Sequence, residues 1–198
     1  MAPRVAASAV PNNHNNPQGF MSSPSPAPEH GHHEPPAILD IEASGFGLGS
    51  YPIEIGFVLP DGSSWCSLVH PEPDWQHWDP EAAAVHGILR EQLVQHGRSP
   101  EALCALLNER LGGMTVYSDA WAHDYTWLNR LYEVAGVSPR FRLENLRALL
   151  NDQDAAQWHE AKRRVAQSAG LQRHRASADA RLLQQTWLAL RGTQRAAA

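Results

Sequence analysis

Apolar and polar positions follow patterns along this chain that change abruptly at Ala37. The run from Ala37 to Ala43 is apolar apart from two acids and predicts a buried strand. The segments Tyr51 to Leu59 and Ser63 to His70 are two further strand candidates, separated by the turn signal Pro60-Asp61-Gly62. Because the connections between the three segments are short, we expect antiparallel strands.

Helical spacing takes over after Pro80. Ser99 and Pro100 are typical of a helix N-cap and first helical position, and leucines follow at positions 103, 106, 107 and 111. The other expected elements are a helix over Asp124–Ala135, short strands at Met114–Tyr117 and Phe141–Leu143, helices over most of Glu144–Gln167, and a last helix from about Ser177 to Leu190. Three strands followed by alternating helices and strands predict an α/β fold with a mixed five-stranded sheet and helices on both faces.

The first 36 residues differ in composition from the rest of the chain. They hold eight of its fifteen prolines, with Asn, Ser and His, and show no apolar periodicity. Such a segment cannot bury enough surface to offset the entropy of ordering it. We therefore expect a disordered tail over residues 1–36 and one domain over residues 37–198. The sequence leaves open whether translation starts at Met1 or at Met21.

Composition narrows the class of protein. A chain with 42% hydrophobic and 19% charged residues is ordinary for a soluble globular protein. No run of about 18 apolar residues indicates a membrane span, and the first residues lack the apolar stretch of a signal peptide. Cys66 and Cys104 are too few for a disulfide framework or a cysteine zinc site. We therefore expect a cytoplasmic protein.

Charge is unevenly distributed along the chain. The formal net charge is −5, yet residues 1–139 hold 5 Lys/Arg against 16 Asp/Glu, whereas residues 140–198 hold 11 against 5. The basic part includes Lys162, Arg163 and Arg164, which could follow a phosphate backbone through their local field. A solvated helix face explains the same run of charges, so it does not decide the function by itself.

Asp40 and Glu42 are acids within an expected buried strand. Residues two apart in a strand point to the same face, so both carboxylates project together while Leu39 and Ile41 project the other way. At a separation of about 6–7 Å they repel by about 2–3 kcal/mol, with an effective dielectric of about 20. A divalent cation removes this repulsion, because Mg²⁺ and Mn²⁺ prefer carboxylate oxygens. Two acids that face solvent on an edge strand are the plain alternative.

Two further candidate groups lie at the starts of expected helices. Asp124 heads an amphipathic helix, where an N-cap aspartate is a sufficient explanation. In the segment from His174 to Leu183, Ser177 can cap the last helix, so that Asp179 falls in its first turn and His174 in the preceding loop. Each group has an ordinary structural explanation, but their order along the chain is distinctive.

This set of motifs resembles the DEDDh 3′–5′ exonucleases, which include ribonuclease T, oligoribonuclease and the proofreading exonucleases on a ribonuclease H-like fold. The first motif of that family matches Leu39-Asp40-Ile41-Glu42, and His86-Gly87-Ile88 matches its H-G-I element. Asp124 stands for the second motif, and His174 with Asp179 forms the third at the spacing H-x₄-D. The similarity extends over Ala37 to Leu190. Ala43, Ala120 and His123 replace the threonine, asparagine and phenylalanine that the family often has.

The resemblance implies a metal-dependent 3′–5′ exonuclease domain over residues 37–198. Asp40, Glu42, Asp124 and Asp179 would hold two divalent cations, Mg²⁺ or Mn²⁺, and His174 would act as general base. The implied substrate is a single-stranded 3′ end of DNA or RNA. The further residues proposed for substrate contact are Ser44, His86, Arg173 and Arg175.

Other functions stay open from the sequence alone. A non-catalytic module that binds nucleic acid or a protein partner could use the same fold, since a fold does not determine a function. The choice between DNA and RNA, the length of the substrate, a polymerase partner and a homodimer are equally undetermined.

Overall fold

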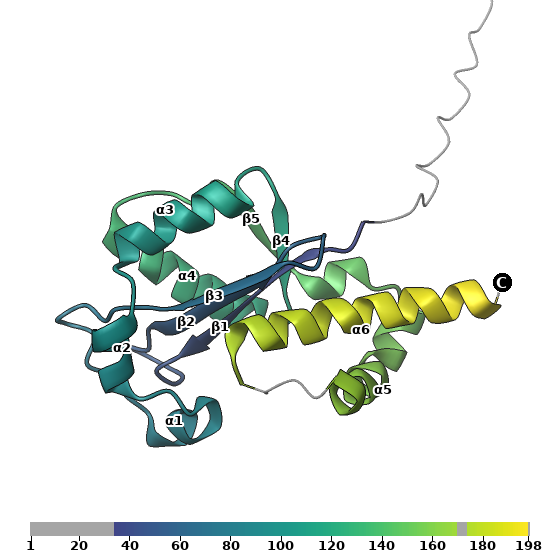
Figure 1. Cartoon of the computed structure of the whole chain (residues 1–198), viewed down its shortest axis with the longest axis horizontal. Helices are drawn as coiled ribbons and strands as arrows, with labels where there is room; N and C mark the ends of the chain where they lie inside the picture. The colour runs from purple at the N-terminus through teal and green to yellow at the C-terminus, as the bar shows by residue number, and fades with distance from the viewer. Residues whose placement is uncertain (1–33, 170–173, 198) are drawn as a thin grey trace, which may run out of the picture. The chain divides into compact units, whose positions relative to one another are not determined.

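A computed structural model describes residues 34–169 and 174–197 of the chain. These residues form an α/β domain built on one five-stranded sheet with the strand order β3-β2-β1-β4-β5 (Figure 1). The strands are β1 (Ala37–Ala43), β2 (Pro52–Val58), β3 (Ser64–Leu68), β4 (Thr115–Ser118) and β5 (Arg142–Asn145). β1, β2 and β3 are antiparallel neighbours, whereas β4 and β5 are parallel to β1. The mixed five-stranded sheet expected from the sequence is confirmed.

Helices cover both faces of this sheet, as expected. They are α1 (Pro80–His86), α2 (Arg90–His96), α3 (Pro100–Leu111), α4 (Trp121–Ala135), α5 (Asp152–Ala169) and α6 (Ala176–Ala197), with a 3₁₀ turn at Leu146–Leu149. Figure 1 shows α6 along one face, with α5 beside it, and α3 and α4 on the opposite face. One apolar cluster joins the sheet to α3 and α4, and a second joins it to α5 and α6.

β1 distributes its side chains between these two clusters. Leu39 and Ile41 belong to the cluster with α3 and α4, whereas Ile38 belongs to the cluster with α6. Since successive side chains of a strand alternate, Asp40 and Glu42 share the α6 face with Ile38. The expected opposition of acids and aliphatic residues along this strand is therefore present.

A glycine on β2 allows α6 to approach the acidic part of β1. Gly56 is paired with Asp40 in the β1–β2 register. A Cβ atom at Gly56 would lie only 2.2 Å from the backbone nitrogen of Ser177. The absence of a side chain there brings the first turn of α6 directly against the sheet, next to Asp40.

Two helices begin earlier than the sequence predicted. α4 begins at Trp121, so Asp124 lies within its first turn and is not its N-cap. Its carboxylate accepts a hydrogen bond from the Ser118 hydroxyl, a side chain from β4. α6 begins at Ala176 and not at Ser177, because Glu54 of β2 accepts the backbone N–H of Ala176 at 2.9 Å. At α6, an acid from a distant strand thus accepts a backbone N–H that local capping rules assign to a nearby side chain.

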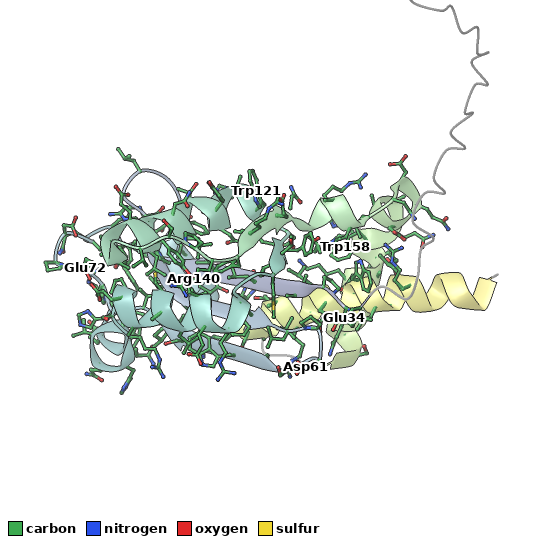
Figure 2. The ribbon with its side chains drawn as sticks, turned by 90° about the horizontal axis from the view of Figure 1, so that it is seen from above. Glu34, Asp61, Glu72, Trp121, Arg140 and Trp158 are labelled. Atoms are coloured by element: carbon green, nitrogen blue, oxygen red, sulfur yellow. The ribbon has the colours of Figure 1, made fainter. Side chains whose placement is uncertain are left out.

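Three helical tryptophans lie in the core: Trp127, Trp158 and Trp187 are each less than a tenth exposed. Trp158 packs in the cluster between α5, α6 and the sheet (Figure 2). Most of the tail expected over residues 1–36 lies outside the described residues. Pro36 is buried, and its carbonyl accepts a hydrogen bond from Gln184 at 2.9 Å. No helix in residues 34–169 and 174–197 is long and apolar enough to cross a membrane.

Candidate metal centre

Three carboxylates meet where β1 lies against the first turn of α6. Asp40 and Glu42 come from the same face of β1, and Asp179 comes from α6. One ligand atom from each residue lies within 4.8 Å of the others, and all three residues are half-buried. Asp179 lies more than a hundred positions after Asp40 and Glu42 in the sequence, and the fold brings the three together.

Asp124 lies beside this cluster but deeper in the protein. It is 1% exposed, and the Ser118 hydroxyl donates to its Oδ2 atom. Its charge contributes to the raised pKa of Asp40, which places the two carboxylates in the same electrostatic environment. Burial raises the pKa of Asp124 itself to about 7, although the Ser118 hydrogen bond opposes the shift.

The carboxyl groups of this site disfavour one another's ionisation. Burial, followed by the charges of Asp124 and Glu42, raises the pKa of Asp40 well above its usual value. Burial, followed by the charge of Asp179, raises the pKa of Glu42 to about 7. Clustered, partly desolvated carboxylates of this kind need a positive charge to be stable in ionised form. Their oxygen donors suit Mg²⁺ or Mn²⁺, so the residues fit a divalent metal centre.

His174 precedes α6 and is tied to the same cluster. Its backbone N–H donates to Asp179 Oδ2 at 2.9 Å. The φ angle of His174 is 63°, in the left-handed region that residues with a Cβ atom rarely adopt. Arg173, the residue before it and a candidate for substrate contact, lies outside the described residues.

His86 presents a buried hydrogen-bond donor. Its Nδ1 atom accepts the backbone N–H of Ile88 at 3.0 Å, which puts the ring proton of the neutral form on Nε2. Within the described part of the chain, Nε2 is buried and has no hydrogen-bond partner. Burial lowers the pKa of His86, so the ring is neutral. Glu54 and His174 also influence this pKa, which places His86 close to the site.

The other two candidates for substrate contact already have partners. Ser44 is 1% exposed; its Oγ accepts the backbone N–H of Tyr51 at 3.1 Å and lies 3.0 Å from His77 Nδ1. Arg175 bonds the carboxylate of Glu54, with its Nε atom 3.1 Å from each oxygen. Glu54 lies 121 positions before Arg175 in the sequence, so only the fold shows that the two are partners.

Aromatic side chains gather around the first turns of α4 and the turn after β1. Phe46, in the Gly-rich turn after β1, is 67% exposed, and its ring lies edge-on to that of His123 at 5.1 Å. His123 in turn stacks on Trp127 at 5.7 Å. Trp121 stacks on Tyr125 at 5.4 Å, and its indole N–H donates to the Leu143 carbonyl. In the sequence, the one signal for this aromatic group is Phe46, an apolar residue in a turn between two strands.

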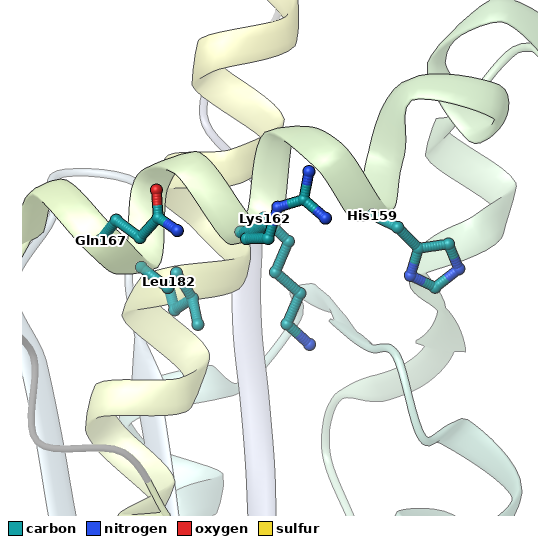
Figure 3. A pocket seen from close by; sticks show the side chains of 6 residues that line it. His159, Lys162, Gln167 and Leu182 are labelled. Carbon is teal, nitrogen blue, oxygen red and sulfur yellow. The ribbon is translucent and has the colours of Figure 1, made fainter.

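The basic run of α5 lies close to acids. Lys162 Nζ is 2.8 Å from Asp119 Oδ2, and Asp119 contributes to the raised pKa of both Asp40 and Asp124. Arg163 and Arg164 both contact Glu160 of the same helix. A groove of about 440 Å³ lies between α5 and α6 (Figure 3), lined by His159, Lys162, Arg163, Ala166, Gln167 and Leu182. The basic side of α5 therefore borders the acidic site through Lys162.

Solved structures of exonuclease I share this fold. E. coli exonuclease I in complex with a dA16 oligonucleotide matches with a TM-score of 0.60 at 12% identity, over 80% of this chain and 41% of that chain. Exonuclease I from Methylocaldum szegediense matches with a TM-score of 0.60 at 13% identity, over 78% and 40%. The zinc-bound complex of E. coli exonuclease I with single-stranded DNA matches with a TM-score of 0.57 at 13% identity, over 80% and 41%.

No protein-family model matches the sequence, and no curated protein matches it either. The chain spans about two fifths of the length of the exonuclease I chains that it resembles. At this level of identity the likeness concerns the fold. The described part of the chain has the ribonuclease H-like α/β fold of exonuclease I.

Proposed function

We propose that this protein is a metal-dependent exonuclease that hydrolyses phosphodiester bonds from the 3′ end of a single-stranded nucleic acid. The observation that carries the proposal is the convergence of Asp40, Glu42 and Asp179 within 4.8 Å, with Asp124 beside them and His174 bonded to Asp179. This is the set of residues, in the same chain order, that the resemblance to DEDDh exonucleases implies.

The four acids would hold two divalent cations, Mg²⁺ or Mn²⁺. When bound, such cations supply positive charge that stabilises the transition state of phosphodiester hydrolysis and makes a water molecule more acidic. The protein's own contribution is a rigid set of oxygen ligands from β1, α4 and α6. Because these carboxylates repel one another, the site favours cation binding at neutral pH.

His174 would accept the proton of the attacking water as general base. An imidazole is suited to this transfer near neutral pH. Its backbone bond to Asp179 keeps it next to one of the carboxylates. His86, with its neutral and buried Nε2–H, would donate a hydrogen bond to the 3′-terminal nucleotide.

Ser44, Arg173 and Arg175 complete the set of side chains proposed for the substrate. Ser44 and Arg175 would act mainly through the loop and helix that they fix, since both are hydrogen-bonded within the protein. Exposed Phe46 offers a face on which a nucleobase can stack, an interaction that does not depend on base sequence. The oligonucleotide complexes of E. coli exonuclease I support a single-stranded substrate.

The test is cleavage of 5′-labelled single-stranded DNA and RNA oligomers of the same sequence. Each is incubated with Mg²⁺, Mn²⁺ or EDTA, with the Asp40→Asn variant alongside. We expect a ladder that shortens from the 3′ end, requires metal and disappears in the variant. Folded protein that binds the oligomers but cuts neither would overturn the proposal in favour of a non-catalytic binding module.

A further inference from the structure

Glu54 is a buried acid on β2 that lies outside the metal centre. It is 0% exposed and is paired with Glu42 in the β1–β2 register. A buried carboxylate is stable only where donors surround it. Arg175 supplies Nε at 3.1 Å from both oxygens and Nη2 to Oε1, and the Ala176 N–H donates to Oε2 at 2.9 Å. All of these donors come from the start of α6.

His174 lies between this ion pair and the acid Asp179. Its N–H is bonded to Asp179 Oδ2, and the next residue in the chain is Arg175, which is bonded to Glu54. The backbone of His174 adopts φ of 63°, which is unfavourable for a residue with a Cβ atom. Such a conformation persists only when the surroundings hold it in place. Here the N–H of His174 and the side chain of the next residue, Arg175, are both held by hydrogen bonds.

We propose that Glu54 and Arg175 are positioning residues whose ion pair fixes the orientation of His174 relative to Asp40, Glu42 and Asp179. This proposal rests on the function proposed above, in which His174 is the base. The fork of a guanidinium on a carboxylate fixes direction as well as distance, which a lysine ammonium cannot do. Arg175 also counteracts the rise in the pKa of Glu42, which burial and the charges of Asp179 and Glu54 cause.

A purely structural role would only anchor α6 to the rest of the domain. The same helix offers a matched case, in which Arg191 Nη1 lies 2.7 Å from Asp154 Oδ2 and Asp154 is 1% exposed. That pair joins α6 to α5. It also joins an arginine of comparable exposure to a buried carboxylate, here an aspartate, but it is distant in sequence from His174. Arg191→Lys is therefore a control for the loss of an ion pair as such.

The experiment compares Arg175→Lys, Glu54→Gln and Arg191→Lys in the full chain. Steady-state cleavage of a 5′-labelled oligonucleotide with Mn²⁺ gives kcat and KM, and thermal unfolding gives Tm. We expect Arg175→Lys and Glu54→Gln to lower kcat by about 10–100-fold, the usual effect of removing a residue that orients an active-site group, with KM unchanged. Arg191→Lys should lower Tm and leave kcat at the wild-type value.

A second measurement does not depend on activity. In protein labelled with ¹⁵N-histidine, the ring signals of His174 are identified by their loss in His174→Ala. We expect one set of signals in the wild type and in Arg191→Lys. Arg175→Lys and Glu54→Gln should shift or split them, because the ring then samples more than one orientation.

The outcomes separate the two proposals. Wild-type kcat and unchanged His174 signals in Arg175→Lys and Glu54→Gln would overturn the positioning role. An equal loss of kcat in Arg191→Lys would show that the ion pair matters only for stability. If the wild-type protein cuts neither DNA nor RNA, the proposed nuclease function fails, while the histidine signals still decide whether the pair orients His174.

Discussion

The two faces of the sheet differ in the side chains that β1 and β2 present to them. The face under α3 and α4 is lined with aliphatic and aromatic residues, such as Leu39 and Ile41 from β1. The face under α6 receives Asp40 and Glu42 from the same strand, and Glu54 from β2. Both faces bury apolar area, but the α6 face also brings together charges that repel.

This difference separates the residues that stabilise the fold from the candidate metal ligands. The apolar side chains on the α3–α4 face can be replaced only at a cost in folding free energy. Asp40 and Glu42, on the α6 face, destabilise the domain in their ionised form, and a bound cation would explain their presence there. Substitutions on the two faces should therefore separate stability from activity.

The largest effect is expected from Asp40→Asn. The substitution removes one ligand and one negative charge, so cleavage should fall to background. The metal-free variant should be at least as stable as the wild type, because burial and repulsion disfavour the Asp40 carboxylate. Calorimetric titration with Mn²⁺ and thermal unfolding check both points. A variant that fails to fold would show that Asp40 is structural.

The next largest effect is expected from His174→Ala. Loss of a general base should lower kcat by about 10²–10⁴-fold, with Mn²⁺ affinity retained. Single-turnover cleavage measures the rate of the chemical step. If the variant turns over like the wild type, another group takes the proton.

Leu107→Ala tests the opposite face. Leu107 of α3 is fully buried, so its truncation should reduce the free energy of unfolding by about 2–5 kcal/mol. Urea denaturation measures this loss. Activity per folded molecule should equal that of the wild type, and a selective loss of kcat would contradict the separation of the two faces.

Gly56→Ala should lower both stability and activity, because the new side chain pushes α6 away from the sheet. The new Cβ would lie 2.2 Å from Ser177 N and 2.5 Å from Ala176 C. We expect a loss of about 1–3 kcal/mol in stability, accompanied by a fall in kcat. Gly192→Ala is the matched control on α6, since a Cβ there meets nothing within 4 Å. Equal behaviour of the two variants would mean that the close approach at Gly56 has no functional effect.

The smallest effect concerns pH. Burial raises the pKa of Glu42 and that of Asp124 to about 7, so the folded protein holds more protons than the unfolded chain between about pH 4 and 7. Stability without metal should therefore fall by about 1–2 kcal/mol as the pH rises through this range, after allowance for solvent screening. Adding Mn²⁺ at pH 8 should restore it. A flat curve without metal would indicate that the carboxylates do not interact.

Much of the candidate site could be predicted because its signals are local. The spacing of Asp40 and Glu42 in an apolar strand indicates a common face, and the spacing of His174 and Asp179 indicates a loop and a first helical turn. The role of Glu54 could not be predicted in this way. Arg175 neutralises the negative charge of Glu54, and no local sequence pattern predicts a contact between β2 and the start of α6.

The predicted N-caps of α4 and α6 were wrong, because both predictions used local sequence alone. Capping rules assign the first helical N–H groups to a nearby side chain, such as Ser177 for α6. In the structure, Glu54 from a distant strand accepts the Ala176 N–H, and Asp124 bonds Ser118 of β4. The fold class was predictable, since the order of strands and helices follows from periodicity. Which strand supplies a helix with its first acceptor depends on packing.

The candidate metal ligands come from both β1 and α6, and this separation along the chain determines when during synthesis the site can form. The ribosome makes Asp40 early and Asp179 much later, and the two meet only after α6 has packed on the sheet. A nascent chain that has formed β1, β2 and β3 still lacks a ligand and the candidate base. Any cleavage activity would therefore begin only once α6 has been synthesised and has folded onto the sheet.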